Sequence, residues 1–595
     1  MRYCLLATLL PVCCWPQLIP SGSPVPRTSS PPVVFINGFQ DVCPGSFTNT
    51  FGIADQVLQA NGEASLFFDT CSLPQTASIE DLGAAFGQFL SGLTYQDGQP
   101  VGQMDVIAHS MGGLVLRCYL SGKQNAAGMF SPPANSQVRK VVFLATPHFG
   151  TPLALLAGFN TKLQELASGS QFLFDLATWN QGTDDLRGVD AVAAVGNAGS
   201  GLAVMRGFDD GVVALTSASL RFYMPGRTQV VPFCHVGSGG LLGLTGLCVQ
   251  NAKGIANIES ASDPTAQIIT SFLNGTGAWK SVGTAAENDP FLSVDGGLDV
   301  EGHGSDDSPL KLNSASATST AASKQLNIPS SLVAYTDLFP AGQVTLTTMS
   351  SVGTVSNTVT LAPGGTQAFV VKQGPQISRV LPAAANTFPL SVAPGMFAAI
   401  YGSSLASGTA QASALPFPTQ LSDTQALVNG NPMGLEYVSG TQINAVIPDN
   451  ASGLVQLTVR NSTGSRTVNL LIETAVPAIF TLDASGSGAA AALNATNDQV
   501  VSASNPLRAG DFVELFATGL GQTGNRGGLD YAIQQPTVMI GGKDCPVTFA
   551  GRAPGYVGLD QINCIVPSGI GANPAAPVAI ASGNRSSNVA TLAVQ

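Results

Sequence analysis

A serine between small residues stands where an apolar strand pattern changes into a helical one. Residues 103–116 read QMDVIAHSMGGLVL, with the strand pattern ending at Ala108 and the helical pattern starting at Met111. Small residues at Ala108 and Gly112 allow the sharp strand-to-helix turn that projects the Ser110 hydroxyl. The positive end of the helix dipole and a free backbone N–H would then lie where an oxyanion develops. This context predicts that Ser110 is a covalent nucleophile.

A serine hydroxyl is a weak nucleophile until a base, usually a histidine, accepts its proton. The chain has four histidines, so the choice is narrow. His109 adjoins the serine and cannot easily turn onto its hydroxyl, and His303 lies in a stretch expected to be solvated. His235 follows an apolar strand pattern in VVPFCHVGSGG and is the preferred base, with His148 as the alternative.

Three blocks of the N-terminal half occur in an order typical of one enzyme family. AHSMGGLVLRCYL at 108–120 resembles the nucleophile turn of bacterial lipases and related α/β hydrolases. VVFINGF at 33–39 is similar to the first strand and loop of that family, and ATPHFGTPLA at 145–154 is similar to a block after a later strand. The resemblance covers about residues 31–275 and implies an α/β-hydrolase domain.

The resemblance also implies which residues complete the site. These enzymes follow the chain order serine, acid, histidine, which favours His235 over His148. RGFDDGVVALTSA at 206–218 is similar to the segment that carries the family's acid, so that Asp210 is the expected acid and Asp209 its main rival. The remaining acidic residues of the interval lack such a context: Asp184, Asp185 and Asp190.

The oxyanion hole of the family is built from backbone N–H groups. By resemblance, those of Phe39 and Met111 would bind the oxyanion in this chain. Asn37 departs from the family, which usually has a histidine at this place, but its amide can still form hydrogen bonds within the loop.

Alternating strand and helix patterns over residues 31–275 predict a βαβ sheet, and so the α/β class. The expected strands are 33–37, 64–68, 103–108, 139–145, 191–196 and 228–232, and the expected helices are about 77–94, 111–122 and 264–274. Residues 155–181 are apolar on more than one face and fall between strands, so we expect them to form a lid.

The second half of the chain has a different composition. Residues 276–327 are rich in Gly, Ser, Ala and Asp and predict a linker, within which the acidic stretch 289–307 lacks the spacing of a calcium loop and is expected to be solvated. Residues 328–377 show a period of two and predict a small all-β module.

An internal repeat occupies the last part of the chain. VAPGMFAAIYGSSL at 392–405 matches LRAGDFVELFATGL at 507–520. Both copies later contain the pattern Gln-Ile-Asn-x-x-[IV]-Pro, at 442–448 and at 561–567. The copies, at 378–475 and 477–595, have the size of immunoglobulin-like sandwiches and resemble the C-terminal modules of many exported bacterial proteins.

Cysteines and the N-terminus predict export. Residues 3–15 form an apolar stretch too short to span a bilayer, which indicates a signal peptide at 1–23, and no later segment is apolar enough to cross a membrane. Cys13 and Cys14 leave a lipoprotein as an alternative. The other cysteines, paired by proximity, predict three disulfides and a free Cys118: Cys43–Cys71, Cys234–Cys248 and Cys545–Cys564.

Composition excludes several other functions. The net charge of −12 leaves no basic patch for nucleic acid or for anionic membrane surfaces. No Cys/His cluster has the spacing of a zinc site, and the expected chemistry needs no cofactor. The sequence therefore predicts a secreted or cell-surface bacterial serine hydrolase acting on carboxylic, above all lipid acyl, esters. An acyltransferase on the same residues, or an adhesion protein with an inactive hydrolase domain, is the alternative, and the β modules would contact a cell surface or an insoluble substrate.

Overall fold

The computed structural model describes residues 18–40, 42–156, 160–201, 207–237, 246–385, 391–583 and 585–595. Most of the predicted signal peptide at 1–23 lies outside these residues. Its last part runs beside a strand, where the Ile19 N–H donates a hydrogen bond to the Ser65 carbonyl oxygen at 3.0 Å. Across the described ranges, no helix is long and apolar enough to cross a membrane.

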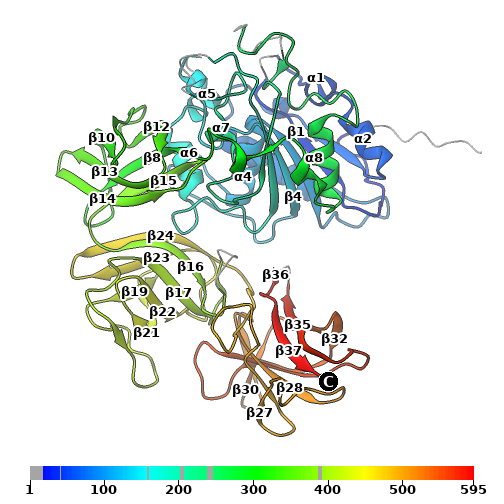
Figure 1. Ribbon diagram of the computed structural model, residues 1–595, viewed down its shortest axis with the longest axis vertical. Helices are drawn as coiled ribbons and strands as arrows, with labels where there is room; N and C mark the ends of the chain where they lie inside the picture. Colours follow the sequence, from blue (N-terminus) through cyan, green and yellow to red (C-terminus); the bar gives the residue numbers. More distant parts are fainter. Residues whose placement is uncertain are drawn as a thin grey trace, which may run out of the picture.

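A seven-stranded sheet forms the centre of the N-terminal part (Figure 1). Its strand order is β2-β1-β3-β4-β5-β6-β7, parallel from β2 to β6, with β7 antiparallel to β6. The strands are β1 (Val33–Ile36), β2 (Ser65–Phe68), β3 (Met104–His109), β4 (Val138–Leu144), β5 (Asp190–Gly196), β6 (Thr228–Val231) and β7 (Thr284–Ala285). All six strands expected from the sequence are present, and the predicted α/β class is confirmed.

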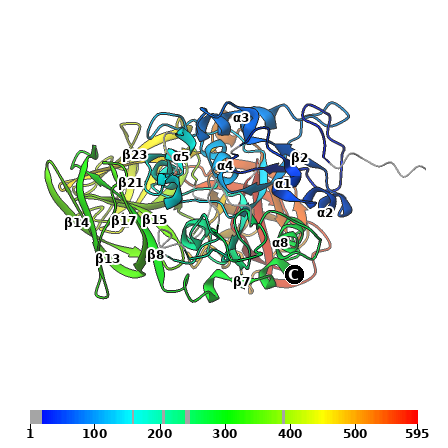
Figure 2. The same cartoon turned by 90° about the horizontal axis from the view of Figure 1, so that it is seen from above.

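Helices cover both faces of the sheet because successive strand side chains alternate between two apolar cores. Val34 and Val106 point into the core shared with α3 and α4, whereas Val33 and Phe35 point into the core shared with α1, α2 and α8. Figure 2 shows α3 and α8 on opposite sides of the strands. The helices are α1 (Phe47–Phe51), α2 (Ala54–Ala60), α3 (Ile79–Ser91), α4 (Met111–Ser121), α5 (Thr161–Glu165), α6 (Gln171–Thr178), α7 (Leu215–Ala218) and α8 (Pro264–Leu273).

Capping residues define where α3 begins and where α4 ends. α3 begins at a capping box in which the Ser78 hydroxyl accepts from the Asp81 N–H and the Asp81 carboxylate accepts from the Ser78 N–H. α4 ends at Gly122, whose φ of 62° is left-handed and costs glycine little. The sequence analysis missed α1, α2, α5, α6 and α7, each of which has eight residues or fewer.

Residues 295–371 form a β-module of two small sheets that lies against α6 and α7 (Figure 1). One sheet has the order β11-β10-β13-β14 and the other the order β12-β8-β15. The strands are β8 (Asp295–His303), β9 (Pro309–Leu310), β10 (Leu312–Thr318), β11 (Ser323–Gln325), β12 (Val333–Pro340), β13 (Gly342–Ser350), β14 (Gly353–Leu361) and β15 (Thr366–Val371).

The predicted linker at 276–327 is therefore wrong, because β7 to β11 lie within it. Inward-facing and outward-facing side chains alternate along β10, but both kinds are small, so composition does not reveal the alternation. Ala315 and Ala317 of β10 face inward and fill the core of the β-module. The expectation that 289–307 is solvated is wrong for a related reason. Asp299 lies in the middle strand β8 and is only 1% exposed, and burial raises its pKa well above the usual carboxyl value.

The last part of the chain forms two β-sandwiches whose central strands repeat the same pairing. In the first, Phe397 of β17 (Phe397–Ser403) pairs with Val446 of β22 (Gln442–Val446). In the second, Phe512 of β28 (Phe512–Thr518) pairs with Ile565 of β34 (Asp560–Ile565). These four residues occupy equivalent places in the sequence repeat. The two copies therefore fold with the same register around separate apolar cores.

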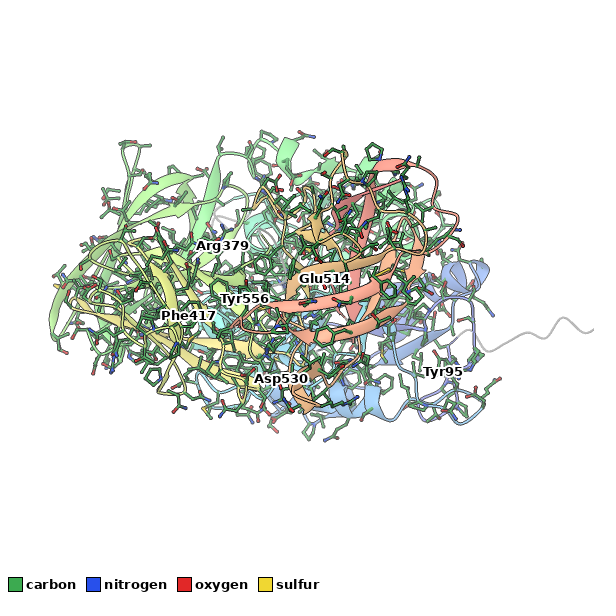
Figure 3. The ribbon with its side chains drawn as sticks, turned by 90° about the horizontal axis from the view of Figure 1, so that it is seen from below. Tyr95, Arg379, Phe417, Glu514, Asp530 and Tyr556 are labelled. Atoms are coloured by element: carbon green, nitrogen blue, oxygen red, sulfur yellow. A yellow bond between two sulfur atoms is a disulfide. The ribbon has the colours of Figure 1, made fainter. Side chains whose placement is uncertain are left out.

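The other strands of the sandwiches complete their sheets. They are β16 (Gln376–Pro382), β18 (Ala410–Gln411), β19 (Gln425–Val428), β20 (Asn431–Pro432), β21 (Gly434–Val438), β23 (Gly453–Asn461) and β24 (Gly464–Ile472) in the first, and β25 (Ala478–Ile479), β26 (Ala492–Asn494), β27 (Gln499–Val500), β29 (Thr523–Arg526), β30 (Leu529–Ala532), β31 (Thr537–Ile540), β32 (Lys543–Cys545), β33 (Val547–Arg552), β35 (Asn573–Ser582), β36 (Arg585–Ser586) and β37 (Ala590–Val594) in the second. Seen from below, Phe417 and Tyr556 lie on the sandwiches, which face the viewer, and Tyr95 lies on the α/β part (Figure 3).

The apolar segment 155–181 is not a lid where the structure describes it. The side chains of Phe172 and Leu173 are buried in the core of the α/β part. At its end, the Gln181 N–H donates to the Asn469 carbonyl oxygen at 2.6 Å, and the Leu471 N–H donates to Asn180 Oδ1 at 3.0 Å. The segment is apolar on several faces because α6 is packed between α4 of the α/β part and β15 of the β-module, and its last residues reach the first sandwich.

Candidate active site

Ser110 occupies a strained turn between β3 and α4. Its φ of 55° and ψ of −130° place a non-glycine residue in a rarely populated conformation that only a tightly packed site maintains. The packing leaves no room for larger neighbours. A Cβ at Gly112 would lie 2.6 Å from the Asn37 carbonyl oxygen, and one at Gly38 would lie 2.7 Å from Ser110 Cβ. The sharp turn predicted from small residues is thus present.

The structure brings Ser110, His235 and Asp210 together in one chain of hydrogen bonds. His235 Nε2 lies 2.8 Å from Ser110 Oγ, and His235 Nδ1 lies 2.8 Å from Asp210 Oδ2. A carboxylate can only accept, so Nδ1 carries the proton and Nε2 of the neutral ring accepts from the serine hydroxyl. Asp210 and His235 are buried, whereas Ser110 is half-buried. Proton transfer from the serine to the imidazole needs no rearrangement in this geometry.

Backbone groups hold the carboxylate of Asp210 in place. Its Oδ1 accepts hydrogen bonds from the N–H groups of Val212 at 3.0 Å and Val213 at 2.7 Å, which leaves Oδ2 for the histidine. The carbonyl oxygen of Asp210 accepts from the His235 N–H at 2.8 Å, so the two residues are joined twice. The disulfide Cys234–Cys248 lies beside this contact.

Asp209, the rival acid, points elsewhere. Its Oδ1 accepts from the Gly211 N–H at 2.7 Å, and burial raises its pKa to about 6. The other acidic residues of the interval are engaged in separate contacts. Asp184 binds Arg117, Asp185 accepts from Asn180, and Asp190 pairs with Arg227.

The other three histidines do not contact the serine hydroxyl. His109 Nε2 donates to the His235 carbonyl oxygen at 3.2 Å, and burial lowers the pKa of His109 to about 3. His148 lies in the core, where Arg117 binds its Nδ1 at 3.2 Å and its carbonyl oxygen at 3.0 Å. His303 is not solvated as expected, because its Nε2 lies 3.0 Å from the Glu301 carboxylate in β8.

The two groups expected to bind an oxyanion flank the nucleophile. Met111 begins α4, and a backbone N–H in the first turn of a helix has no partner within that helix. Phe39 lines the same cleft as Ser110. Both positions agree with the expected role, which stays a prediction.

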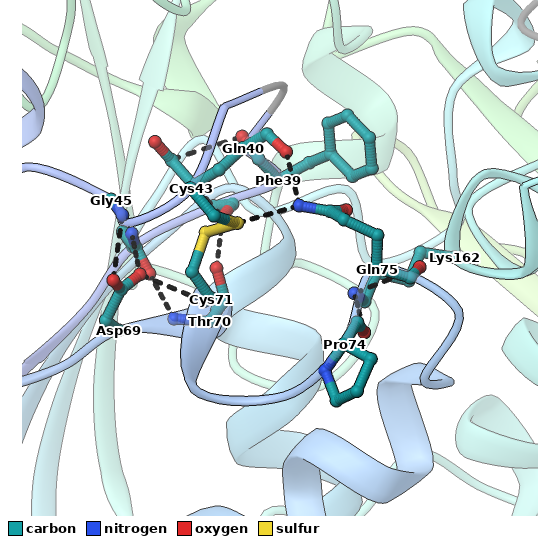
Figure 4. The surroundings of a disulfide bond; sticks show 12 residues. Phe39, Gln40, Cys43, Gly45, Asp69, Thr70, Cys71, Pro74, Gln75 and Lys162 are labelled. Carbon is teal, nitrogen blue, oxygen red and sulfur yellow. Dashed lines mark hydrogen bonds between the residues drawn. A yellow bond between two sulfur atoms is a disulfide. The ribbon is translucent and has the colours of Figure 1, made fainter.

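A polar network behind the oxyanion loop was not predicted from the sequence. Asn37 is fully buried; its Nδ2 donates to Asp69 Oδ1 at 2.9 Å and its Oδ1 accepts from the Thr70 N–H at 2.8 Å. The disulfide Cys43–Cys71 closes the loop on the same side (Figure 4). A signal was present in the sequence, since polar residues follow β2 directly and precede a paired cysteine.

Ser110 lines a cleft of about 390 Å³. Its described apolar lining includes Phe39, Val42 and Val236, and Val42 is 78% exposed at the rim. Polar side chains line the cleft as well: Gln40, Ser46, Asn49, Thr50 and Asn257. None of the described residues of segment 155–181 lines it.

Within the described part of the chain, no group of three or more His, Cys, Asp or Glu side chains is arranged to hold a metal ion. The three predicted disulfides are present, and Cys118 is free and buried, as predicted. Burial raises the pKa of the Cys118 thiol well above its usual value, which makes it unreactive.

No family model matches the chain, and no curated protein matches it. Among solved structures, the chain is similar to phospholipase PlaB from Legionella pneumophila at 14% identity and a TM-score of 0.42, over 58% of this chain and 93% of that one. It is similar to lipase BlEst2 from Bacillus licheniformis at 22% identity and a TM-score of 0.28, over 36% and 89%. It is also similar to the Thermogutta terrifontis esterase Est2 at 13% identity and a TM-score of 0.26, over 44% and 87%.

Proposed function

We propose that the protein is a serine hydrolase that cleaves carboxylic esters through an acyl-enzyme intermediate. The observation that carries this proposal is the unbroken chain of 2.8 Å contacts from Asp210 through His235 to Ser110. An ordinary serine in a turn has neither an oriented base nor a strained backbone. An adhesion protein with an inactive domain would not need to maintain either.

The geometry supports a role for each residue in the proposed reaction. Ser110 Oγ attacks the ester carbonyl carbon while His235 Nε2 takes its proton, and Asp210 stabilises the imidazolium that forms. The N–H groups of Phe39 and Met111 bind the oxyanion of the tetrahedral intermediate. His235 then protonates the leaving alcohol, and a water activated by the same ring hydrolyses the acyl-enzyme. No cofactor takes part in these steps.

The lining of the cleft supports a substrate class. The apolar side chains of Phe39, Val42 and Val236 suit the acyl group of a lipid ester, and the polar side chains of the same cleft suit a hydroxylated alcohol. We propose water as the second substrate, which makes the reaction a hydrolysis. An acyltransferase would use the same residues with an alcohol in place of that water, and product analysis separates the two.

Export and anchoring complete the proposal. Three disulfides need an oxidising compartment, which supports a secreted or cell-surface location. The two C-terminal sandwiches, which we propose to be immunoglobulin-like, carry none of the site residues. We therefore assign them to contact with a cell surface or an insoluble substrate.

One experiment tests the chemistry directly. The full chain is labelled with a fluorophosphonate probe, and hydrolysis of p-nitrophenyl esters of graded chain length is measured for the wild type and for Ser110→Ala. We expect Ser110→Ala to abolish both labelling and turnover. Labelling that persists in Ser110→Ala, or a wild type that neither labels nor hydrolyses any ester, contradicts the proposal.

A further inference from the structure

The peptide group between Gly38 and Phe39 lies directly against the nucleophile. A Cβ at Gly38 would be 2.7 Å from Ser110 Cβ and 3.1 Å from Ser110 Oγ. This close approach requires glycine at position 38, and the next backbone N–H along the chain is that of Phe39. The orientation of this peptide group therefore decides whether the N–H of Phe39 can reach an oxyanion.

A buried hydroxyl holds the other end of the same peptide group. Thr70 Oγ1 donates a hydrogen bond to the Gly38 carbonyl oxygen at 2.8 Å, and Thr70 is 3% exposed. A peptide group is planar and almost always trans, so its C=O and N–H point in opposite directions. Fixing the carbonyl of Gly38 towards Thr70 thus fixes the N–H of Phe39 away from it.

Thr70 is itself held by the network behind the loop (Figure 4). Its N–H donates to Asn37 Oδ1 at 2.8 Å, and Asn37 Nδ2 donates to Asp69 Oδ1 at 2.9 Å. Asp69 also accepts from the N–H groups of Gly45 at 2.8 Å and Cys71 at 3.0 Å. Thr70 therefore has a single fixed position relative to the loop, as an orienting group needs.

We propose that Thr70 is a positioning residue for ester cleavage, acting by aiming the Phe39 N–H at the developing oxyanion. The inference rests on the proposed hydrolase function and adds to it a residue that never touches the substrate. The only other described side chain near the Gly38 carbonyl is the Gln40 amide, at 3.5 Å, the limit of a hydrogen bond.

An oxyanion exists only in the transition state and the tetrahedral intermediate. Loss of its alignment should lower kcat and leave KM nearly unchanged. Removal of a whole oxyanion donor costs roughly 10²–10³-fold in kcat in serine hydrolases, so misalignment of one donor should cost about ten-fold or more. Affinity for a boronic acid, which forms a tetrahedral adduct with the serine, should fall in parallel.

The test compares three variants of the full chain. Thr70→Val removes the hydroxyl and keeps the shape, and Thr70→Ser keeps the hydroxyl. Thr424→Val is the matched control, because the buried Thr424 hydroxyl likewise donates to a carbonyl oxygen, that of Leu405 at 3.1 Å, in the first sandwich. For each, kcat and KM on p-nitrophenyl butyrate, inhibition by phenylboronic acid and the thermal unfolding midpoint are measured.

We expect Thr70→Val to lose at least ten-fold in kcat and in boronate affinity, with KM within two-fold of the wild type. Thr70→Ser should keep most of the wild-type kcat and boronate affinity. Thr424→Val should keep wild-type kinetics even if its unfolding midpoint falls equally. Should Thr70→Val not fold, Thr70→Ala removes the same hydroxyl and is measured in its place. An active wild type whose Thr70→Val variant keeps its kcat and boronate affinity overturns the inference, whereas a wild type without esterase activity overturns the proposed function itself.

Discussion

His109 Nε2 lies 3.2 Å from the carbonyl oxygen of His235, so one histidine holds the backbone of the other. Their ring centroids are 5.0 Å apart, yet only His235 reaches the nucleophile. His235→Ala should lower kcat by about 10³-fold or more, because a positioned base contributes at that scale. His109→Ala removes one hydrogen bond worth about 1 kcal/mol and should cost roughly five-fold. Steady-state kinetics on a soluble ester separate the two, with His303→Ala as an unaffected control.

The buried His109 ring should also make stability depend on pH. Its pKa is lowered to about 3 by burial, then by the neighbouring His235. His109 is therefore protonated in the unfolded chain below about pH 6.5, whereas in the folded chain it stays neutral until about pH 3. Stability from this residue is present above about pH 6.5 and is lost as the pH falls, by about 1.4 kcal/mol per unit. The unfolding free energies of the wild type and of His109→Phe are measured from pH 7 to pH 4. The unfolding free energy of the wild type minus that of His109→Phe should fall as the pH is lowered. A difference that does not change with pH would mean that the ring is solvated.

Asp210 and Asp209 are adjacent in the chain but should respond very differently to the same substitution. Asp210→Asn presents an amide N–H or a weaker acceptor to His235 Nδ1 and favours the wrong tautomer of the ring, which should lower kcat by about 10³–10⁴-fold. Asp209→Asn should lower it by less than ten-fold, because the Asp209 carboxylate bonds only the backbone of its own turn among the described contacts. Equal losses in both variants, at equal unfolding midpoints, would show that the acid was assigned wrongly.

The disulfide Cys43–Cys71 joins the oxyanion loop to the Asn37 network and spans 28 residues. Loop-closure entropy predicts that its removal costs roughly 3–4 kcal/mol of unfolding free energy. The pair Cys43→Ala and Cys71→Ala should therefore unfold at lower denaturant concentration and lose activity before it unfolds, since the loop beside Ser110 loosens first. The matched control is the pair Cys545→Ala and Cys564→Ala in the second sandwich, which should be destabilised without loss of activity at low temperature.

The sequence was sufficient for the central sheet and for the residues that meet at its edge. The strands carry long apolar runs, and Ser110 and His235 follow β3 and β6 at the carboxyl edge of the sheet. Asp210 lies in the long connection after β5 and was expected from the family resemblance of 206–218. Cysteine pairing was also predictable, because each pair lies within one short stretch of chain. The network of Asn37, Asp69 and Thr70 was not predicted. Polar residues do follow β2 directly, but the hydrogen bonds join residues 32 and 33 positions apart, and the local sequence does not identify such partners.

Two errors arose because composition alone does not reveal what a side chain packs against. Alternating small side chains in 276–327 were mistaken for a linker, although Ala315 and Ala317 fill a core. The apolar segment 155–181 was mistaken for a lid, although its described part packs against α4 and the β-module and ends at the first sandwich. Composition does not distinguish a residue that faces solvent from one that faces a second module.

This packing bears on whether the α/β part folds alone. A chain cut to residues 24–280 loses β7, which pairs with β6 through Val230 and Thr284, and so exposes the edge of the sheet. It also removes two hydrogen bonds of the fully buried Gln181. The Gln181 N–H donates to the Asn469 carbonyl oxygen, and its Oε1 accepts from the Val380 N–H. Buried polar groups left without partners cost about 1–3 kcal/mol each.

We therefore expect residues 24–280 to be poorly soluble and to lose activity on p-nitrophenyl butyrate. Residues 24–373 keep β7 and the β-module and should be more soluble, with an unfolding midpoint still below that of the full chain, because Gln181 and Asn180 lack the first sandwich. We compare the full chain with the two shorter chains by their soluble yield, their thermal unfolding midpoint and their specific activity. A soluble 24–280 fragment with the full-length rate would show that the contacts between the parts contribute nothing to the catalytic unit. Graded losses would instead show that the sandwiches support the fold that holds Ser110 against His235.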